Sequence, residues 1–249
     1  MLKRSRWPLA WVLVSAFWLA AAPEGSAQTG LLPVDAELVL AADGSGSIDD
    51  AELRLQREGY AAAITNPRFL EAVASGYHGK VALAFMEWGG PESQHTIVDW
   101  MVIDGPKSAQ AFAAKLLSEP RAAFSYNSIS EAIIYSINLI NTNAYAGKRR
   151  IVDVSADGPQ MNGRPMAYAH AMAQQYRVIV NGLVVNSHAG FSGPTSGSLD
   201  QHFKNDIIFG PGAFVTVAEG RDDFARAILK KMILEIAYAD PGHGRRPRR

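Results

Sequence analysis

The chain has 249 residues, 48% of them hydrophobic, which is enough apolar material for one large α/β domain or two small ones. Its 24 lysines and arginines balance 24 aspartates and glutamates, so the chain lacks the excess of positive charge that is typical of nucleic-acid-binding proteins. It contains no cysteine, which excludes a disulfide framework and a lipid anchor attached through a cysteine.

The first 27 residues have the features of a secretion signal. Three basic residues, Lys3, Arg4 and Arg6, precede an apolar stretch at 9–22, and residues 25–27 (GSA) supply the small side chains of a cleavage site. We therefore expect residues 1–27 to be removed and the mature bacterial protein to be periplasmic or secreted, without a stable membrane span. An uncleaved anchor is the alternative, although the apolar stretch is short for a span.

A predicted strand that runs into a polar turn is the central feature of the remaining chain. The continuous apolar run 38–42 is typical of a strand covered on both faces by helices, and the stretch 43–47 (DGSGS) follows it. The two glycines allow a tight turn, in which Asp43, Ser45 and Ser47 can point their oxygens toward one position. A carboxylate with two hydroxyls suits Mg²⁺, Mn²⁺ or Ca²⁺. A turn that binds nothing is the other interpretation.

Strands and helices alternate through the rest of the chain. Runs of apolar residues predict strands, and apolar residues spaced three or four apart predict helices. We expect strands at 80–88, 94–103, 150–155, 178–185, 207–209 and 213–217, and helices at 50–64, 69–74, 108–117, 128–141, 165–176 and 222–237. Between these elements, residues 186–206 read as a long polar loop with a short helix near 199–203.

This alternation predicts one α/β domain over residues 34–238. The strand at 94–103 follows the strand at 80–88 after a short turn, which is typical of an antiparallel hairpin at a sheet edge. We therefore expect a doubly wound, mostly parallel, Rossmann-like sheet with one antiparallel edge strand. Residues 239–249 are largely basic and lack apolar anchors, so we expect a disordered tail.

Polar residues stand at the carboxyl ends of three predicted strands. Asp43 follows the first strand, Glu87 lies near the end of the second, and Asp157 follows the strand at 150–155. Because ligands of open α/β sheets bind beyond the carboxyl ends of the strands, we expect these groups to lie close together, with Asn127 and Ser128 joining them from the start of a helix. Glu87 is expected either to act at the site, by binding metal-bound water or by competing with an incoming acidic partner, or to form a salt bridge at the sheet rim.

The DGSGS stretch resembles the metal-ion-dependent adhesion site (MIDAS) of von Willebrand factor A (VWA) domains. That family builds its site from D-x-S-x-S, a threonine that opens a helix, and an aspartate that is usually followed by glycine. Residues 43–47 match the first pattern and residues 157–158 match the third, whereas Asn127 stands at the threonine position and Ser128 comes next. The resemblance implies that Mg²⁺, Mn²⁺ or Ca²⁺ is held by Asp43, Ser45, Ser47, Asn127, Ser128 and Asp157.

The chain also resembles, along nearly its whole mature length, an exported bacterial branch of VWA-like proteins described only as a domain of unknown function (DUF1194-like). The stretches that carry this likeness are ELRLQREGYAAAI, MEW, VDVSADGP, VNGLVV, FGPGAFV and FARAILKKMILEIA. The likeness implies the VWA fold and does not imply a particular activity.

Three interpretations of function follow from these residues. In VWA domains an acidic side chain of a protein partner fills the open position on the cation, so the resemblance implies a binding module rather than an enzyme. A Mg²⁺-dependent hydrolase, phosphohydrolase-like with Asp43 as nucleophile, is the alternative, but Ser45 stands where the D-x-D pattern of haloacid-dehalogenase-type enzymes has a second carboxylate. A metal-free VWA-like scaffold is the third interpretation.

Overall fold

The computed structural model describes residues 30–186 and 198–237. The expected signal segment at 1–27, the expected tail at 239–249 and part of the expected polar loop lie outside the described residues. Among the residues described, no helix is both long and apolar enough to cross a membrane.

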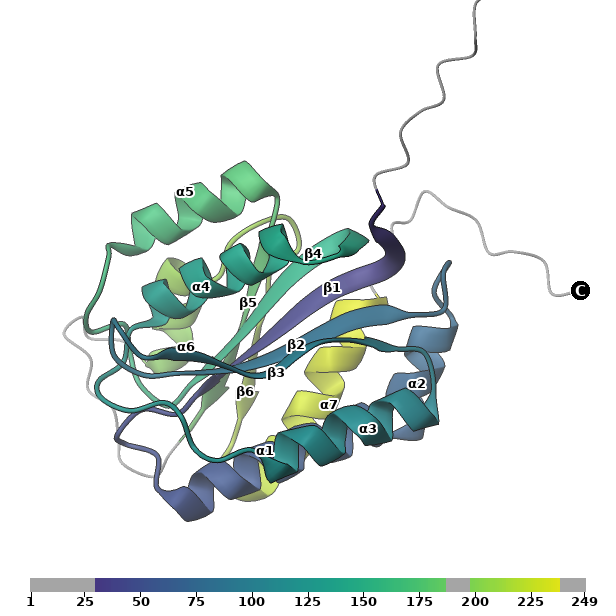
Figure 1. The fold of residues 1–249 in the computed structure, drawn as a ribbon. Coiled ribbons are helices and arrows are strands. Elements are labelled where there is room, and N and C mark those ends of the chain that lie inside the picture. Colours follow the sequence, from purple (N-terminus) through teal and green to yellow (C-terminus); the bar gives the residue numbers. More distant parts are fainter. Residues whose placement is uncertain (1–29, 187–197, 238–249) are drawn as a thin grey trace, which may run out of the picture. The chain divides into compact units, whose positions relative to one another are not determined.

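A six-stranded sheet forms the centre of the domain, in the order β3-β2-β1-β4-β5-β6 (Figure 1). Its strands are β1 (Leu32–Asp43), β2 (Val81–Trp88), β3 (Gln94–Ile103), β4 (Tyr145–Ala156), β5 (Ile179–Val185) and β6 (Val215–Ala218). Neighbouring strands are parallel except for β2 and β3, which form an antiparallel hairpin at one edge. The prediction of a mostly parallel, doubly wound sheet with one antiparallel edge strand is confirmed.

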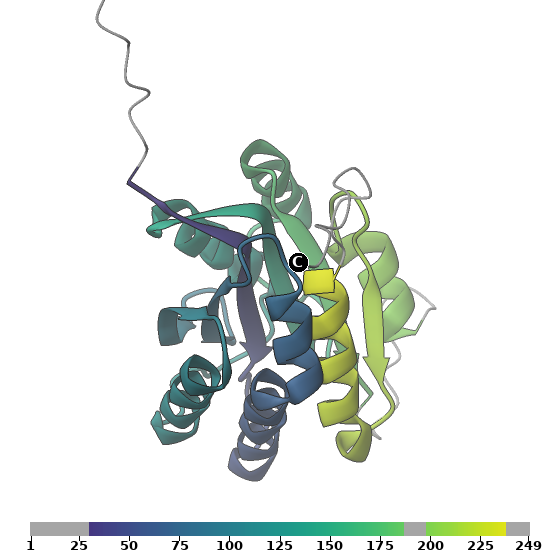
Figure 2. The same ribbon diagram turned by 90° about the vertical axis from the view of Figure 1, so that its right-hand side faces the viewer.

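Helices cover both faces of this sheet (Figures 1 and 2). One face is packed by α1 (Asp50–Thr65), α2 (Pro67–Ala74), α3 (Pro106–Ser118) and α7 (Arg221–Ala237). The other face is packed by α4 (Ile129–Thr142), α5 (Met166–Tyr176), α6 (Leu199–His202) and the π-helical turn η1 (Phe203–Ile207). Each face therefore encloses its own hydrophobic core.

The apolar run in β1 serves both cores. Leu38 and Leu40 point into the core formed with α1, α2, α3 and α7, whereas Val39 and Ala41 point into the core formed with α4 and α5. All four side chains are buried. Because successive side chains of a strand face opposite sides, a strand covered on both faces is apolar at every position.

Two strands are longer than the sequence predicted. β1 begins at Leu32 and β4 begins at Tyr145, well before the apolar runs that identified them. These extra halves pair mainly with each other, in a register that places Leu32 opposite Tyr145. In the first half of β4, exposed and half-buried residues alternate, so this segment lacks the continuous apolar pattern of a central strand.

The short helix expected near 199–203 is present as α6. It is longer than expected, because α6 continues into η1, and the two bury Leu199, Phe203 and Ile207 on one stripe. The strand expected at 207–209 is reduced to one antiparallel bridge between Phe209 and Val180. The strand expected at 213–217 is β6.

Candidate metal centre

The turn after β1 lies at the carboxyl edge of the sheet and is held by two neighbouring loops. The Gly44 N–H donates to the carbonyl of Trp88 (2.8 Å), and the Gly46 N–H donates to the carbonyl of Ser125 (2.9 Å). A Cβ atom on Gly44 would lie 3.0 Å from the Cβ of Ala123. Glycine at this position therefore lets the loop between α3 and α4 approach the turn closely.

Four side chains form a continuous series of polar contacts at this edge. Asp43 Oδ1 accepts a hydrogen bond from the Ser45 N–H (2.8 Å), and the Ser45 and Ser47 hydroxyl oxygens lie 3.0 Å apart. Ser47 Oγ in turn donates to Asp157 Oδ1 (3.1 Å), which links the turn after β1 to the loop after β4. The two loops that were expected to meet do so, although their role as metal ligands stays a prediction.

Helix α1 starts without using these hydroxyls. Asp49 is its N-cap: Asp49 Oδ1 accepts from the Glu52 N–H, and Glu52 Oε2 accepts from the Asp49 N–H, each at 2.8 Å. This reciprocal arrangement satisfies two backbone donors at the helix start. Because Asp49 supplies the cap, the Ser47 hydroxyl remains available to contact Asp157.

Asp43 is the most unusual group of the cluster. Its side chain is almost fully buried, and its Oδ2 atom has no hydrogen-bond partner among the described residues. Burial and, after it, the nearby charge of Asp157 raise the pKa of Asp43 to about 7, against hydrogen bonds from Ser45 that lower it. A buried carboxylate oxygen without a partner is costly, and a cation is the kind of group that removes this cost.

The available donors match a hard cation. Burial also raises the pKa of Asp157, while its hydrogen bond from Ser47 lowers it. Within the described ranges there is no group of three or more His, Cys, Asp or Glu residues that could hold a metal. A cation at this edge would therefore depend on two carboxylates with hydroxyl and amide oxygens, a donor set suited to Mg²⁺, Mn²⁺ or Ca²⁺.

Asn127 and Ser128, the two residues that could replace the threonine of the VWA pattern, have different contacts in the structure. The side chain of Asn127 lies against the loop after β4, since a Cβ atom on Gly158 would be 2.5 Å from Asn127 Nδ2. Ser128, by contrast, is buried, and its hydroxyl donates to the backbone carbonyl of Asn162 (2.8 Å). The contacts described here place Asn127 beside Asp157 and give the Ser128 hydroxyl a structural partner.

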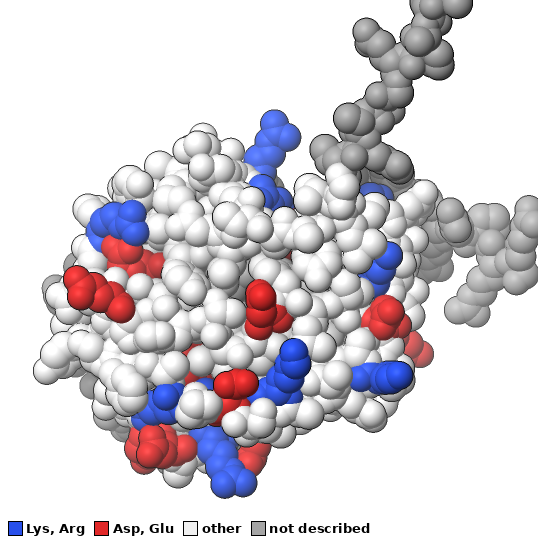
Figure 3. Space-filling view, in the orientation of Figure 1, with Lys and Arg blue, Asp and Glu red and all other residues white. Residues whose placement is uncertain are grey.

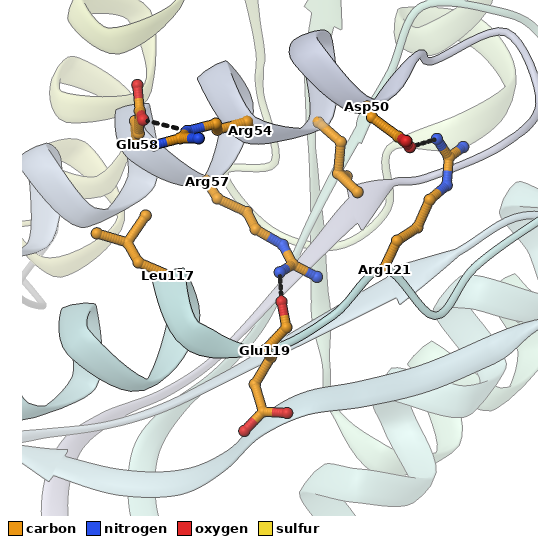
Figure 4. A pocket seen from close by; sticks show the side chains of 8 residues that line it. Asp50, Arg54, Arg57, Glu58, Leu117, Glu119 and Arg121 are labelled. Atoms are coloured by element: carbon orange, nitrogen blue, oxygen red, sulfur yellow. Dashed lines mark hydrogen bonds and ion pairs between the residues drawn. The ribbon is translucent and has the colours of Figure 1, made fainter.

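Glu87 pairs with Arg57 and not with the side chains of this cluster in the described part of the chain. It is fully buried, and its Oε1 atom lies 2.6 Å from Nη2 of Arg57, so its charge is neutralised from α1. The salt bridge that was one of the two expectations for Glu87 is present, although it is buried. The same guanidinium donates to the carbonyl of Glu119 (Figure 4) and to that of Pro120, so Arg57 ties α1 to the loop between α3 and α4.

A pocket of about 440 Å³ lies beside this ion pair, between α1 and the end of α3 (Figure 4). Charged side chains of both signs line it, and Arg54 pairs with Glu58 while Arg121 pairs with Asp50. Because these charges neutralise each other across the pocket, its lining shows no preference for an anionic or a cationic ligand.

Arg121 is a supporting residue that the sequence did not reveal. Its Nη2 atom donates to the carbonyls of Gly44 (3.0 Å) and Ser45 (2.9 Å), and Nη1 pairs with Asp50 (3.0 Å). These bonds fix the backbone of the turn that carries Asp43. No spacing rule predicts this role, since it depends on how the loop between α3 and α4 folds back over the sheet edge.

Comparison with protein families identifies the chain. A family model described as "Protein of unknown function (DUF1194)" matches residues 33–240. The chain belongs to the DUF1194 family. Comparison with the curated proteins finds no match.

Solved structures show the fold of this DUF1194 chain. The pilus adhesin SpaC from Lactobacillus rhamnosus GG is 15% identical (TM-score 0.58), over 83% of this chain and 31% of the adhesin. The vWF domain of the type V pili tip protein Mfa5 from Porphyromonas gingivalis is 9% identical (TM-score 0.53), over 84% of this chain and 98% of that domain. At such identities the likeness shows the fold alone, and this fold is that of a VWA domain.

One further structure carries a metal. Proximal thread matrix protein 1 from the mussel byssus, solved with zinc in its MIDAS motif, is 12% identical with a TM-score of 0.54. The match covers 80% of this chain and 45% of that protein. The DUF1194 chain thus spans less than half of the matrix protein and about a third of the pilus adhesin.

Proposed function

We propose that this DUF1194 protein is a binding module that engages a protein partner through a divalent cation held at the carboxyl edge of its sheet. The observation that carries the proposal is the buried Oδ2 atom of Asp43, which has no hydrogen-bond partner among the described residues. The side chains around it offer only oxygen atoms as metal ligands. The side chains that would hold the cation are Asp43, Ser45, Ser47, Asn127 and Asp157.

A bound Mg²⁺, Mn²⁺ or Ca²⁺ would offer an open coordination position to an acidic side chain of the partner. The chain's own residues prepare this site before any cation arrives. Ser47 donates to Asp157, the Ser45 N–H donates to Asp43, and the guanidinium of Arg121 fixes the turn between them. Because these side chains are already held in place, binding a cation costs less conformational entropy.

The named structural neighbours agree with a binding role. Two of them are pilus proteins, one described as an adhesin, and a third has a MIDAS motif that holds zinc. By analogy we propose that this protein acts outside the cytoplasm, in the periplasm or as a secreted protein, after removal of residues 1–27. An exported protein that retains Met1 on N-terminal sequencing would contradict this part of the proposal.

The hydrolase interpretation receives less support from the site. Asp43 Oδ1 is bonded to the Ser45 N–H, and Ser45 supplies a hydroxyl where a second carboxylate would act as acid and base. The named neighbours are adhesion and matrix proteins rather than enzymes.

Calorimetric titration of the mature protein with MgCl₂ and MnCl₂ tests the proposal. Asp43→Asn removes one of two carboxylates without changing the side-chain shape, so we expect it to abolish cation binding. Glu92→Gln is the matched control, because it removes an exposed charge from the turn between β2 and β3. Failure of the wild-type protein to bind either cation at about 10 mM would favour the metal-free scaffold, since even the weak Ca²⁺ sites of extracellular modules have dissociation constants of about 10⁻⁴–10⁻³ M.

A further inference from the structure

Three large apolar side chains are exposed on the loops around the candidate metal centre. Phe124 and Tyr126, from the loop between α3 and α4, are 57% and 75% exposed, and Met161, from the loop between β4 and α5, is 61% exposed. We call these three residues the apolar rim. Clustered exposed apolar side chains at a candidate site typically mark an interaction surface.

Backbone hydrogen bonds place the rim directly beside the metal centre. Ser125, which separates Phe124 from Tyr126, accepts a hydrogen bond from the Gly46 N–H in the turn after β1. The Met161 N–H donates to the carbonyl of Asn127 (3.1 Å). The rim and the proposed cation ligands are therefore parts of the same loops.

The rim loop is held in one conformation rather than left free. The Phe124 N–H donates to Ser93 Oγ and the Phe124 carbonyl accepts from the Gly90 N–H, each at 3.0 Å. The Arg121 guanidinium lies over the Phe124 ring, 5.3 Å from its centroid. An aromatic side chain that is fixed before binding loses little entropy when a partner covers it.

The backbone of this loop is also strained at the residue between the two aromatic side chains of the rim. Ser125 has φ of 79°, a left-handed conformation that residues other than glycine rarely adopt. On the neighbouring turn, a Cβ atom on Gly89 would lie 2.1 Å from the Phe124 carbonyl oxygen. Strain of this kind tends to be retained at functional sites.

We propose that the apolar rim and the metal centre bind a single protein segment, in which an acidic side chain stands next to a large apolar one. The acidic side chain would reach the cation, so this half of the inference rests on the proposed function. The apolar neighbour would cover Phe124, Tyr126 and Met161. Aromatic residues, methionine and arginine are the residue types that protein-binding surfaces favour.

The charges around the rim favour an isolated acid over a strongly anionic partner. Figure 3 shows scattered charged side chains of both signs with uncharged surface between them, and residues 122–128 of the loop between α3 and α4 carry no charge. The first turn of α1 contributes Glu52, next to the N-cap Asp49, and these carboxylates would repel a run of acidic residues, whereas Asp50 is paired with Arg121. An acidic side chain flanked by apolar residues avoids this repulsion and matches the uncharged loop.

Selection from a phage-displayed library of random linear peptides, with the mature protein immobilised in MgCl₂, tests the inference. We expect enriched peptides to carry Asp or Glu beside Phe, Trp, Leu or Met. Binding of the synthetic peptides should weaken about tenfold or more in Tyr126→Ser and in Phe124→Ser, as is usual at a binding hot spot. Tyr126→Phe should retain binding. Tyr77→Ser is the matched control, because Tyr77 is 62% exposed but lies before β2, at the opposite edge of the sheet.

The outcomes separate this inference from the proposed function. Peptides that require their acid and Mg²⁺ but bind the rim variants as well as the wild type would overturn the inference and leave the metal-dependent function standing. Peptides that depend on the rim but tolerate an acid-to-amide change and a chelator would contradict both. Absence of any enriched peptide, or binding to a glycan array in place of peptides, would overturn the inference that the ligand is a protein segment. Thermal unfolding of each variant checks that its fold is intact.

Discussion

Asn127 and Ser128 are neighbours in the sequence but have different surroundings in the structure. The Asn127 side chain lies against Gly158, beside Asp157, whereas the buried Ser128 hydroxyl donates to the Asn162 carbonyl. At the scale of single residues, this contrast leads us to propose that Asn127 takes the threonine position of the VWA pattern and that Ser128 contributes to stability.

A pair of alanine variants distinguishes these roles. Asn127→Ala should weaken Mg²⁺ binding by at least about tenfold, the effect usual for a group that ligates or supports a metal. Ser128→Ala should leave the affinity unchanged but lower the free energy of unfolding by about 1 kcal/mol, because it removes one hydrogen bond. Calorimetric titration and urea unfolding measure the two effects, and the reverse pattern would show that Ser128 is the ligand.

At the scale of elements, α7 is fastened to the sheet by a buried group of charges. Lys231 on α7 lies 2.7 Å from Asp153 of β4 and 2.5 Å from Glu235, and all three side chains are almost fully buried. Asn181 of β5 donates to Glu235 Oε1 (2.9 Å). Two carboxylates thus share one ammonium group, and the Oδ2 atom of Asp153 and the Oε2 atom of Glu235 have no hydrogen-bond partner in the described part of the chain.

Removing the ammonium group should destabilise the protein strongly. Lys231→Met leaves two carboxylates buried without a counter-charge, which typically costs about 3–5 kcal/mol of unfolding free energy. Lys230→Met is the matched control, because Lys230 is exposed on the same helix and its replacement should change stability by less than about 0.5 kcal/mol. Equal unfolding midpoints in urea for the two variants would show that the buried ammonium group of Lys231 contributes nothing to the stability of the fold.

The same group predicts a pH dependence of stability. Burial and, after it, the charge of Glu235 raise the pKa of Asp153 to about 7, although the charge and hydrogen bond of Lys231 lower it. The folded chain therefore keeps a proton on Asp153 that the unfolded chain has released, so this contribution to stability is present near pH 4 and is lost as the pH rises to about 7. Asp153→Asn should flatten the dependence over this window. A slope in urea unfolding that is the same for wild type and variant would contradict the assignment.

The elements themselves show what a sequence can and cannot predict. β2 and α4 were predicted closely, because an apolar strand buried on both faces and an isoleucine repeat every four residues are local signals. The first halves of β1 and β4 were missed, because their partners are each other. The meeting of Asp43 with Asp157 followed from the parallel sheet, whereas the contacts of Arg121 and the conformation of Ser125 depend on long-range loop packing.

At the scale of the whole molecule, stability comes from the two cores rather than from the candidate metal centre. The cores enclose both faces of β1, β2, β4 and β5, while Ser47 lies at the sheet edge with its hydroxyl in an exposed contact. Hydrophobic burial of this extent is the main source of folding free energy. The position of the site at the edge implies that the fold forms without a cation.

Removal of metal should therefore leave cooperative unfolding intact. Mg²⁺ at one hundred times its dissociation constant would add only about 2.7 kcal/mol, because it binds the folded chain alone. Thermal unfolding in excess chelator should show one cooperative transition that shifts to higher temperature when Mg²⁺ is restored. Asp43→Asn should unfold at the same temperature with and without Mg²⁺. Loss of the cooperative transition in chelator would mean that the cation is required for folding.

The central claim is that a divalent cation is held between the turn after β1 and the loop after β4. An anomalous difference map from crystals of the mature protein grown with MnCl₂ tests it most directly. The account predicts one strong manganese peak within bonding distance of oxygens from Asp43, Ser45 or Ser47 and from the loop that carries Asp157. A map without a peak at this edge, or with manganese only elsewhere on the protein, would contradict it.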